Sequence, residues 1–93
     1  MTRRLKDVQR RIESAREELR VLTEQLDVWT DAFEDARLRA LMSETPQADH
    51  DLADVRRHYD VTRREHDRRV VEIDQMVEER DKLLREWSPK EVP

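Results

Sequence analysis

The chain has 93 residues, of which 45% are charged and 35% hydrophobic, with a formal net charge of −4 and neither Gly nor Cys. This length limits the chain to one small domain, and the absence of Cys and Gly excludes disulfides, thiol chemistry and Gly-rich phosphate-binding loops. Its mixed charges and regular apolar spacing are typical of long helices and not of a disordered chain.

The first predicted helix covers residues 2–43. Its apolar residues alternate at intervals of three and four, which places one continuous stripe along a helix. The stripe contains Leu5, Val8, Ile12, Ala15, Leu19, Leu22, Leu26, Trp29, Phe33, Ala36 and Ala40. An unbroken heptad pattern of this kind predicts packing against a second helix.

A turn is predicted at about residues 44–46, where Pro46 is the one Pro before position 89. Thr45 suits the N-cap position and Pro46 the first position of a new helix, while Asp49 and Asp51 suit its positive end. Because the connection is so short, we expect the chain to fold back as an αα-hairpin.

The second predicted helix covers residues 46–87, and a frayed tail is predicted over 88–93, since Ser88-Pro89 breaks the helix. Its stripe is less regular than the first. We assign to it Leu52, Val55, Tyr59, Thr62, His66, Val70, Ile73, Val77, Arg80, Leu84 and Trp87.

The two stripes match in antiparallel order, large residues facing small ones, when residue numbers that sum to 91 or 92 are paired. Charges agree with this order, because the basic segment 1–22 then faces the acidic segment 70–93. We therefore expect an all-α fold with a single domain over 1–93, an antiparallel two-helix hairpin of the coiled-coil type.

The stretch HYDVTRREHDRR (residues 58–69) places polar groups where the core of the second helix is expected. His50, His58 and His66 recur every eight residues, so successive rings are rotated by about 80° and do not converge on a metal. We predict no catalytic, cofactor or metal site and no enzyme activity. His66 is assigned to the hairpin core, where it marks register, and a pH-sensing role stays open.

Further apolar residues lie outside the two stripes and form a candidate partner surface. They are Val21, Val28, Leu38, Leu41, Met42, Met76 and Leu83. We predict a homodimer, two hairpins packed as an antiparallel four-helix bundle, and a further contact with a larger protein. The expected function is a non-enzymatic protein–protein interaction module, a scaffold or adaptor.

The location expected from the sequence is cytoplasmic, because no apolar run is long enough for a signal or a membrane span. Arg outnumbers Lys sixteen to three, which favours a bacterial origin. The pairs Arg56-Arg57, Arg63-Arg64 and Arg68-Arg69 invite a nucleic-acid interpretation. The negative net charge and the acidic facing segment argue against direct contact with nucleic acid.

The stretch DLADVRRHY (Asp51 to Tyr59) resembles the arm-tip motif of the Gre-type factors that enter the RNA polymerase secondary channel. The Asp-Leu matches, whereas the Tyr is displaced by one residue and the Glu-Asn of that motif is absent. The resemblance implies an alternative function, a polymerase-binding hairpin with an acidic tip. That tip would consist of Glu44, Asp49, Asp51 and Asp54.

Overall fold

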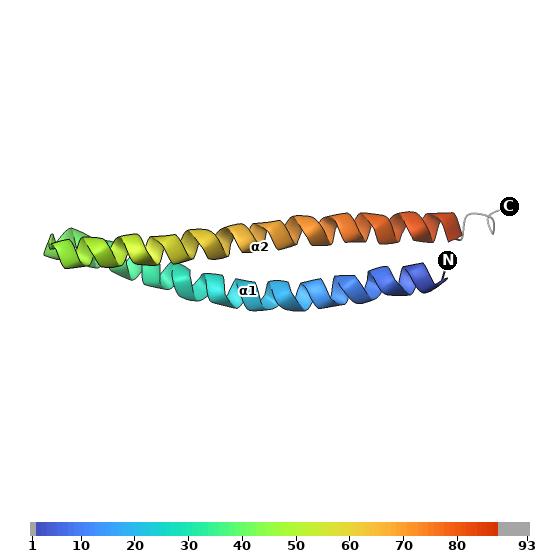
Figure 1. The fold of residues 1–93 in the computed structure, drawn as a ribbon, viewed down its shortest axis with the longest axis horizontal. Helices are drawn as coiled ribbons and strands as arrows, with labels where there is room; N and C mark the ends of the chain where they lie inside the picture. Colours follow the sequence, from blue (N-terminus) through green and yellow to red (C-terminus); the bar gives the residue numbers. More distant parts are fainter. Residues whose placement is uncertain (1, 88–93) are drawn as a thin grey trace. The chain divides into compact units, whose positions relative to one another are not determined.

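The computed structural model describes residues 2–87, which form two helices of 42 residues each (Figure 1). Helix α1 is Thr2–Ser43 and helix α2 is Pro46–Trp87, and no strand occurs within these bounds. These are the bounds that the sequence predicts for the two helices. The described chain is an all-helical, two-helix hairpin. The predicted frayed tail over 88–93 lies outside the described residues.

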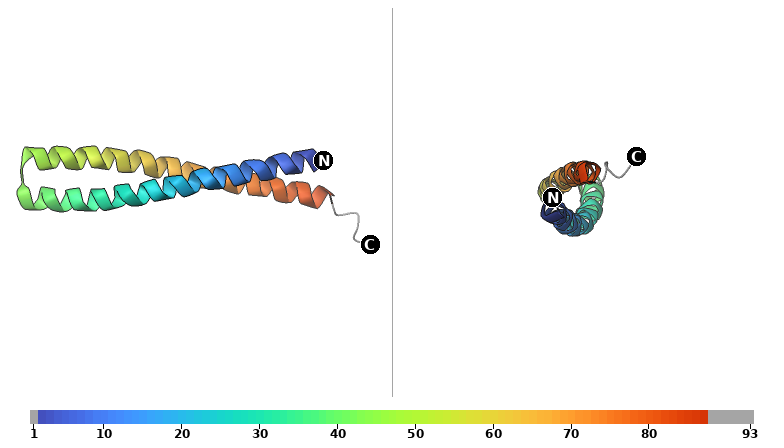
Figure 2. Two further views of the ribbon diagram at one scale, coloured as in Figure 1. Left: turned by 90° about the horizontal axis from the view of Figure 1, so that it is seen from below. Right: turned by 90° about the vertical axis from the view of Figure 1, so that its right-hand side faces the viewer.

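The connection between the helices consists of Glu44 and Thr45, where the chain reverses (Figure 2). Glu44 has a φ of 49°, in the left-handed region that Gly usually occupies at a helix C-terminus. The hydroxyl of Thr45 accepts a hydrogen bond from the Ala48 amide at 3.1 Å. This is the N-cap contact that the sequence predicts, and Pro46 begins α2 directly after it.

The chain divides into two compact units, and both helices contribute to each. The terminal unit consists of Met1–Leu19 with Arg68–Pro93, and the turn unit consists of Arg20–Asp67. The expectation of one domain over 1–93 stays a prediction.

The terminal unit contains a tight aliphatic core between its segments of α1 and α2. The side chains of Ile12 and Val8 are 0% and 1% exposed. The buried members of this core are Val8, Ile12, Ala15, Ile73, Met76 and Leu83, with Leu5, Leu19 and Val77 partly buried against them. Burial of an aliphatic side chain contributes about 1.5–3 kcal/mol, so this cluster supplies much of the unit's stability.

The heptad phase predicted for the C-terminal part of α2 is wrong. Met76 and Leu83, expected on a partner surface, are 8% and 5% exposed and belong to the core. Val70, Leu84 and Trp87, expected in the core, are 36%, 40% and 57% exposed. The physical reason is that the buried stripe keeps the regular alternation of three and four through Arg69, Ile73, Met76, Arg80 and Leu83, whereas the predicted stripe contains two successive intervals of four, from Thr62 to Val70.

The turn unit is packed differently, with half-buried side chains in place of a closed core. Within Arg20–Asp67, Ala36 is the one buried hydrophobic residue, at 5% exposure. The predicted core residues of this unit are all half-buried: Leu22, Leu26, Trp29, Phe33, Leu52, Val55, Tyr59 and His66.

Candidate functional site

The outer surface of α1 in the turn unit carries large exposed apolar side chains. Val28, Leu38, Leu41 and Met42 are 65%, 55%, 69% and 84% exposed, and Val21 is 40% exposed. The sequence assigns these five residues to a partner surface, and the structure leaves them open. Leu38, Leu41 and Met42 have the i, i+3, i+4 spacing of one helix face.

A second apolar surface lies on α2 in the terminal unit, where the sequence predicts core. Val70, Val77 and Leu84 recur every seven residues along the flank of the helix next to Ile73 and Met76. Val77 is partly buried against the core, and the other two are more than a third exposed. We call these three residues the α2 row. The shifted heptad phase is the signal that could have identified them from the sequence.

Arg69 occupies a core position in the terminal unit. Its guanidinium lies 2.8 Å from Glu18 of α1 and 3.0 Å from Glu72 of α2. Its Nε is buried and has no hydrogen-bond partner. A charged group held between two helices restricts which residues can face it, so Arg69 favours one pairing of α1 with α2. Arg80, eleven residues further along α2, donates to Gln9 at 3.5 Å.

Aromatic rings replace aliphatic contacts in the turn unit. Trp29 stacks on His58 with ring centroids 4.6 Å apart and 11° between the planes. Phe33 contacts Tyr59 at 5.3 Å, the pair that the antiparallel order predicts. The partner expected for Trp29 was Thr62, so the stack on His58 was missed. His58 immediately precedes a stripe residue, and nothing in its spacing identifies it.

The histidines do not form a site together. His66 is half-buried, and its Nδ1 lies 3.0 Å from a carboxylate oxygen of Asp67. Within residues 2–87, no group of three or more His, Asp or Glu side chains could hold a metal ion.

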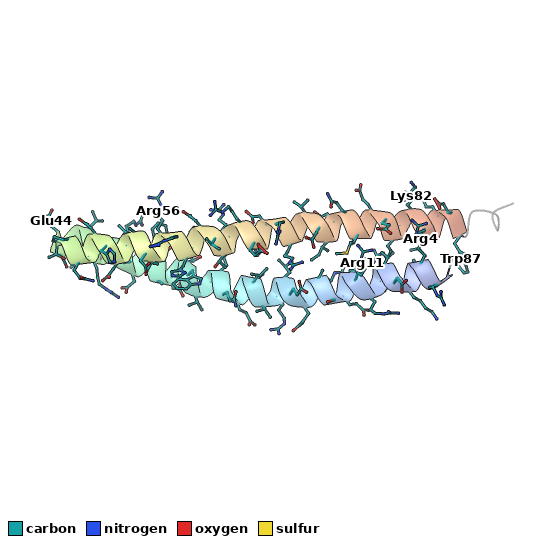
Figure 3. All side chains as sticks on the ribbon, in the orientation of Figure 1. Arg4, Arg11, Glu44, Arg56, Lys82 and Trp87 are labelled. Carbon is teal, nitrogen blue, oxygen red and sulfur yellow. The ribbon has the colours of Figure 1, made fainter. Side chains whose placement is uncertain are left out.

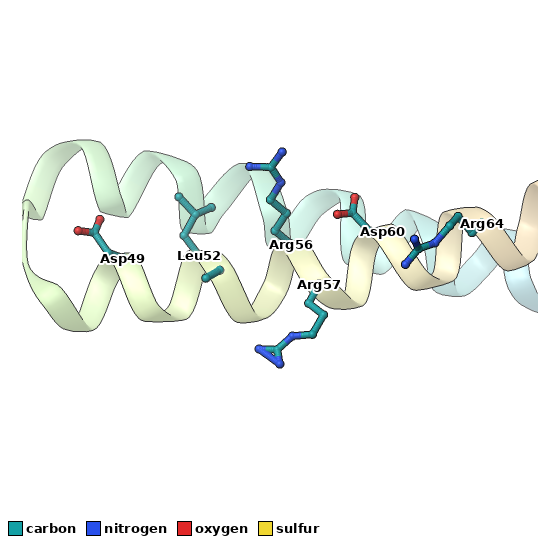
Figure 4. Close-up of a pocket in the computed structure, with 7 residues that line it drawn as sticks. Asp49, Leu52, Arg56, Arg57, Asp60 and Arg64 are labelled. Atoms are coloured by element: carbon teal, nitrogen blue, oxygen red, sulfur yellow. The ribbon is translucent and has the colours of Figure 1, made fainter.

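A shallow hollow of about 410 Å³ lies along one side of α2 in the turn unit (Figure 4). Seven residues line it, all from this helix: Asp49, Leu52, Ala53, Arg56, Arg57, Asp60 and Arg64. Arg57 points away from Arg56 in the close-up and pairs with Asp54 at 2.8 Å. With acids and bases interleaved on one helix, the hollow has no converging set of groups that would select a ligand.

The acids of the proposed tip are exposed but partly engaged. Asp51 accepts a hydrogen bond from Gln47 at 3.0 Å, and Asp54 forms the ion pair with Arg57. These are contacts along one helix surface, of the type that stabilises a helix by a few tenths of a kcal/mol. The four acids therefore do not form a cluster that points at a common ligand.

Basic side chains concentrate at the start of α1, where Arg4 and Arg11 lie along the same side of the helix (Figure 3). Residues 2–12 include five basic residues and one acid, Asp7. Asp7 lies 3.7 Å from Arg10. This part of the helix therefore presents a strong positive charge in a chain that is acidic overall.

Neither described helix has an apolar stretch long enough to cross a membrane. Comparison with known proteins finds no matching family model, no matching curated protein and no matching solved structure.

Proposed function

We propose that the chain is a non-enzymatic, cytoplasmic protein–protein interaction module that pairs with a second copy of itself. The observation that carries this proposal is the α2 row, Val70, Val77 and Leu84, beside the core of the terminal unit. Two hairpins packed through this row form an antiparallel four-helix bundle with twofold symmetry.

The width of the apolar stripe supports a bundle in place of an isolated pair of helices. A two-stranded coiled coil needs apolar residues at two of every seven positions, whereas a helix in a bundle has them at about three of every seven. In the terminal unit, Ile73 and Met76 supply the two inner positions, and the α2 row supplies the third. The third position is the one that a two-helix pair leaves uncovered.

The observed heptad phase places the proposed interface on the α2 row and not on Met76 and Leu83. Met76 and Leu83 pack inside the terminal unit and are unavailable to a partner. The α2 row lies on the adjacent flank and contains residues of similar size. Substitution of Met76 or Leu83 would therefore destabilise the core of the terminal unit, and the interface has to be tested through the row.

The test uses the double variant Val70→Lys with Leu84→Lys, whose two positions are exposed enough to accept Lys without disturbing the core. We expect its native mass, measured by light scattering after size exclusion at about 500 mM salt, to fall from two chains to one while its helical circular dichroism is kept. The matched control is Val61→Lys with Val71→Lys, at 54% and 55% exposure and outside the row. This control should keep the wild-type mass.

Two results would overturn the proposed dimer. The first is a wild-type chain that stays monomeric at the highest concentration reached. The second is a row variant with the same mass as the control variant, since both add the same charge and remove two valine or leucine side chains.

The exposed turn-unit face at Leu38, Leu41 and Met42 lies in the other unit, away from the α2 row in sequence and outside this test. We assign it to the larger protein partner that an adaptor requires. Nucleic acid is not expected to be contacted directly, because the turn unit contains twelve acidic and seven basic residues.

A further inference from the structure

We infer that α1 carries a second self-association surface, in which a basic strip on one copy docks on an acidic strip on another. The basic strip is Arg3, Lys6 and Arg10 in the terminal unit, and the acidic strip is Asp27, Asp31 and Glu34 in the turn unit. This surface is on α1 and does not rest on the α2 row, so it adds a contact beyond the proposed dimer.

The acidic strip belongs to a face of α1 that is unusual in composition. Between residues 24 and 42, twelve side chains are exposed, of which five are acidic, four apolar and only two basic, Arg37 and Arg39. The acidic ones are Glu24, Asp27, Asp31, Glu34 and Asp35. Glu24 pairs with Arg20 and Asp35 with Arg39, on the same helix. Asp27, Asp31 and Glu34 form no ion pair with any described residue.

The basic strip lies at the N-terminus of α1, where positive charge is unfavourable. The N-terminus of a helix carries a partial positive charge, which favours acidic residues in the first turn, and α1 has none there. Within the described residues, Arg3 and Lys6 form no ion pair, and Arg10 has a single loose contact with Asp7 at 3.7 Å. The arrangement is unfavourable in an isolated helix, and an anionic partner would relieve it.

The spacing of residues within each strip brings like charges close together. Arg3 and Lys6 are three residues apart and Lys6 and Arg10 are four apart, so like charges are neighbours on the helix surface. Glu34, Asp31 and Asp27 repeat the same intervals in the opposite direction along the chain. Each strip is therefore self-repelling, and each has the complementary charge.

The matching intervals define an antiparallel register between two α1 helices. When Arg3 faces Glu34 of the second copy, Lys6 faces its Asp31 and Arg10 faces its Asp27. In an antiparallel helix pair, residues at intervals of three and four on one helix meet residues at intervals of three and four on the other. All three pairs form at once without a change in either helix, which makes a second copy the occupant that fits both strips.

The test compares two triple variants by sedimentation equilibrium at about 20 mM and about 500 mM salt. The acid-reversed variant has Asp27→Lys, Asp31→Lys and Glu34→Lys, and the base-reversed variant has Arg3→Glu, Lys6→Glu and Arg10→Glu. In the wild type we expect association beyond the dimer at low salt and its loss at high salt. Each variant alone should associate roughly tenfold more weakly at low salt, because the three exposed ion pairs, each formed twice between two copies, are removed.

Mixing the two variants provides the decisive comparison. Each variant repels itself, but the acid-reversed copy has two basic strips and the base-reversed copy has two acidic strips. A mixture should therefore regain wild-type association at low salt. A matched control, Arg56→Glu with Arg57→Glu and Arg64→Glu, makes the same charge change on α2 and should leave low-salt association within about twofold of the wild type.

Three results would overturn the inference: association of either variant at wild-type strength, a mixture that stays as weak as its components, or an equal loss in the α2 control. Helical circular dichroism of each variant establishes that it is folded. Comparing the Val70→Lys and Leu84→Lys double variant with each triple variant, measured separately, distinguishes the two proposals. Loss of the α2 contact leaves a salt-sensitive dimer, and reversal of the α1 strips leaves a salt-insensitive one.

Discussion

The terminal unit and the turn unit are built from the same two helices but are packed by different means. In the terminal unit, aliphatic side chains are enclosed, with Ile12 and Val8 at 0% and 1% exposure. In the turn unit, Trp29 stacks on the imidazole of His58, and Ala36 is the one buried hydrophobic residue. The turn unit also has twelve acidic residues against seven basic ones, whereas the charges of the terminal unit nearly balance.

This difference in packing indicates that the two units have different roles. Closed aliphatic packing resists local opening, whereas half-buried layers with exposed backbone hydrogen bonds open at lower free energy. The large exposed residues of α1, Val28, Leu38, Leu41 and Met42, all lie in the turn unit. We therefore expect the terminal unit to supply most of the stability and the turn unit to supply adaptable recognition surface.

The largest expected effect comes from truncating one core side chain in each unit, which tests whether the two units are packed differently. Ile12→Ala in the terminal unit should lower the free energy of unfolding by about 3–4 kcal/mol, because a completely buried side chain is lost. Leu26→Ala, at a half-buried position of the turn unit, should lower it by about 1–2 kcal/mol. Urea denaturation at one low protein concentration measures both. Equal losses would show that the two units are packed alike.

An intermediate effect sharpens the boundary of the terminal core. Leu83→Ala should cost about 2–3 kcal/mol, whereas Leu84→Ala should cost under about 1 kcal/mol in the monomer. The two leucines are adjacent in sequence and chemically identical, but they are 5% and 40% exposed. If the order of the two losses were reversed, the heptad phase of α2 would follow Val70, Val77 and Leu84 and not Met76 and Leu83.

The smallest effect concerns the ring stack of the turn unit. His58→Ala should cost about 0.5–1 kcal/mol, the usual contribution of an aromatic pair beyond its buried area. In a Trp87→Phe background Trp29 is the remaining Trp, so its emission should also change when the imidazole is removed. His50→Ala is the control, since His50 is exposed and contacts no described ring. Identical emission in the two variants would mean that the stack does not form.

The sequence is sufficient to predict the two helices, their turn and the stripe of α1. Thr45 and Pro46 mark the start of α2 by a capping contact that depends only on local geometry. In α1, every stripe position holds an apolar residue, so the period has one solution. Exposure of Val28, Leu41 and Met42 follows from the same period, because each lies outside the stripe.

The heptad phase of α2 was predicted wrongly because residue hydrophobicity and regular heptad spacing select different residues for the buried stripe. Arg69 and Arg80 stand at core positions, and Val70 and Leu84 beside them are more hydrophobic. A choice by residue type moves the stripe onto these neighbours, which introduces two successive intervals of four in place of the regular alternation of three and four. The stack of Trp29 on His58 depends on side-chain rotation, which spacing does not encode.

Arg69 has a consequence for errors in helix pairing. The aliphatic residues Val8, Ile12, Ala15 and Leu19 repeat with the heptad, so α2 displaced by seven residues would still meet apolar partners. The guanidinium does not tolerate that displacement, since the heptad positions equivalent to Glu18, which is 2.8 Å away, hold Arg11 and Gln25, and neither supplies a carboxylate. One charged side chain at an otherwise periodic interface thus fixes the register of the two helices. It also penalises mispaired helices when two chains fold close together and could exchange them.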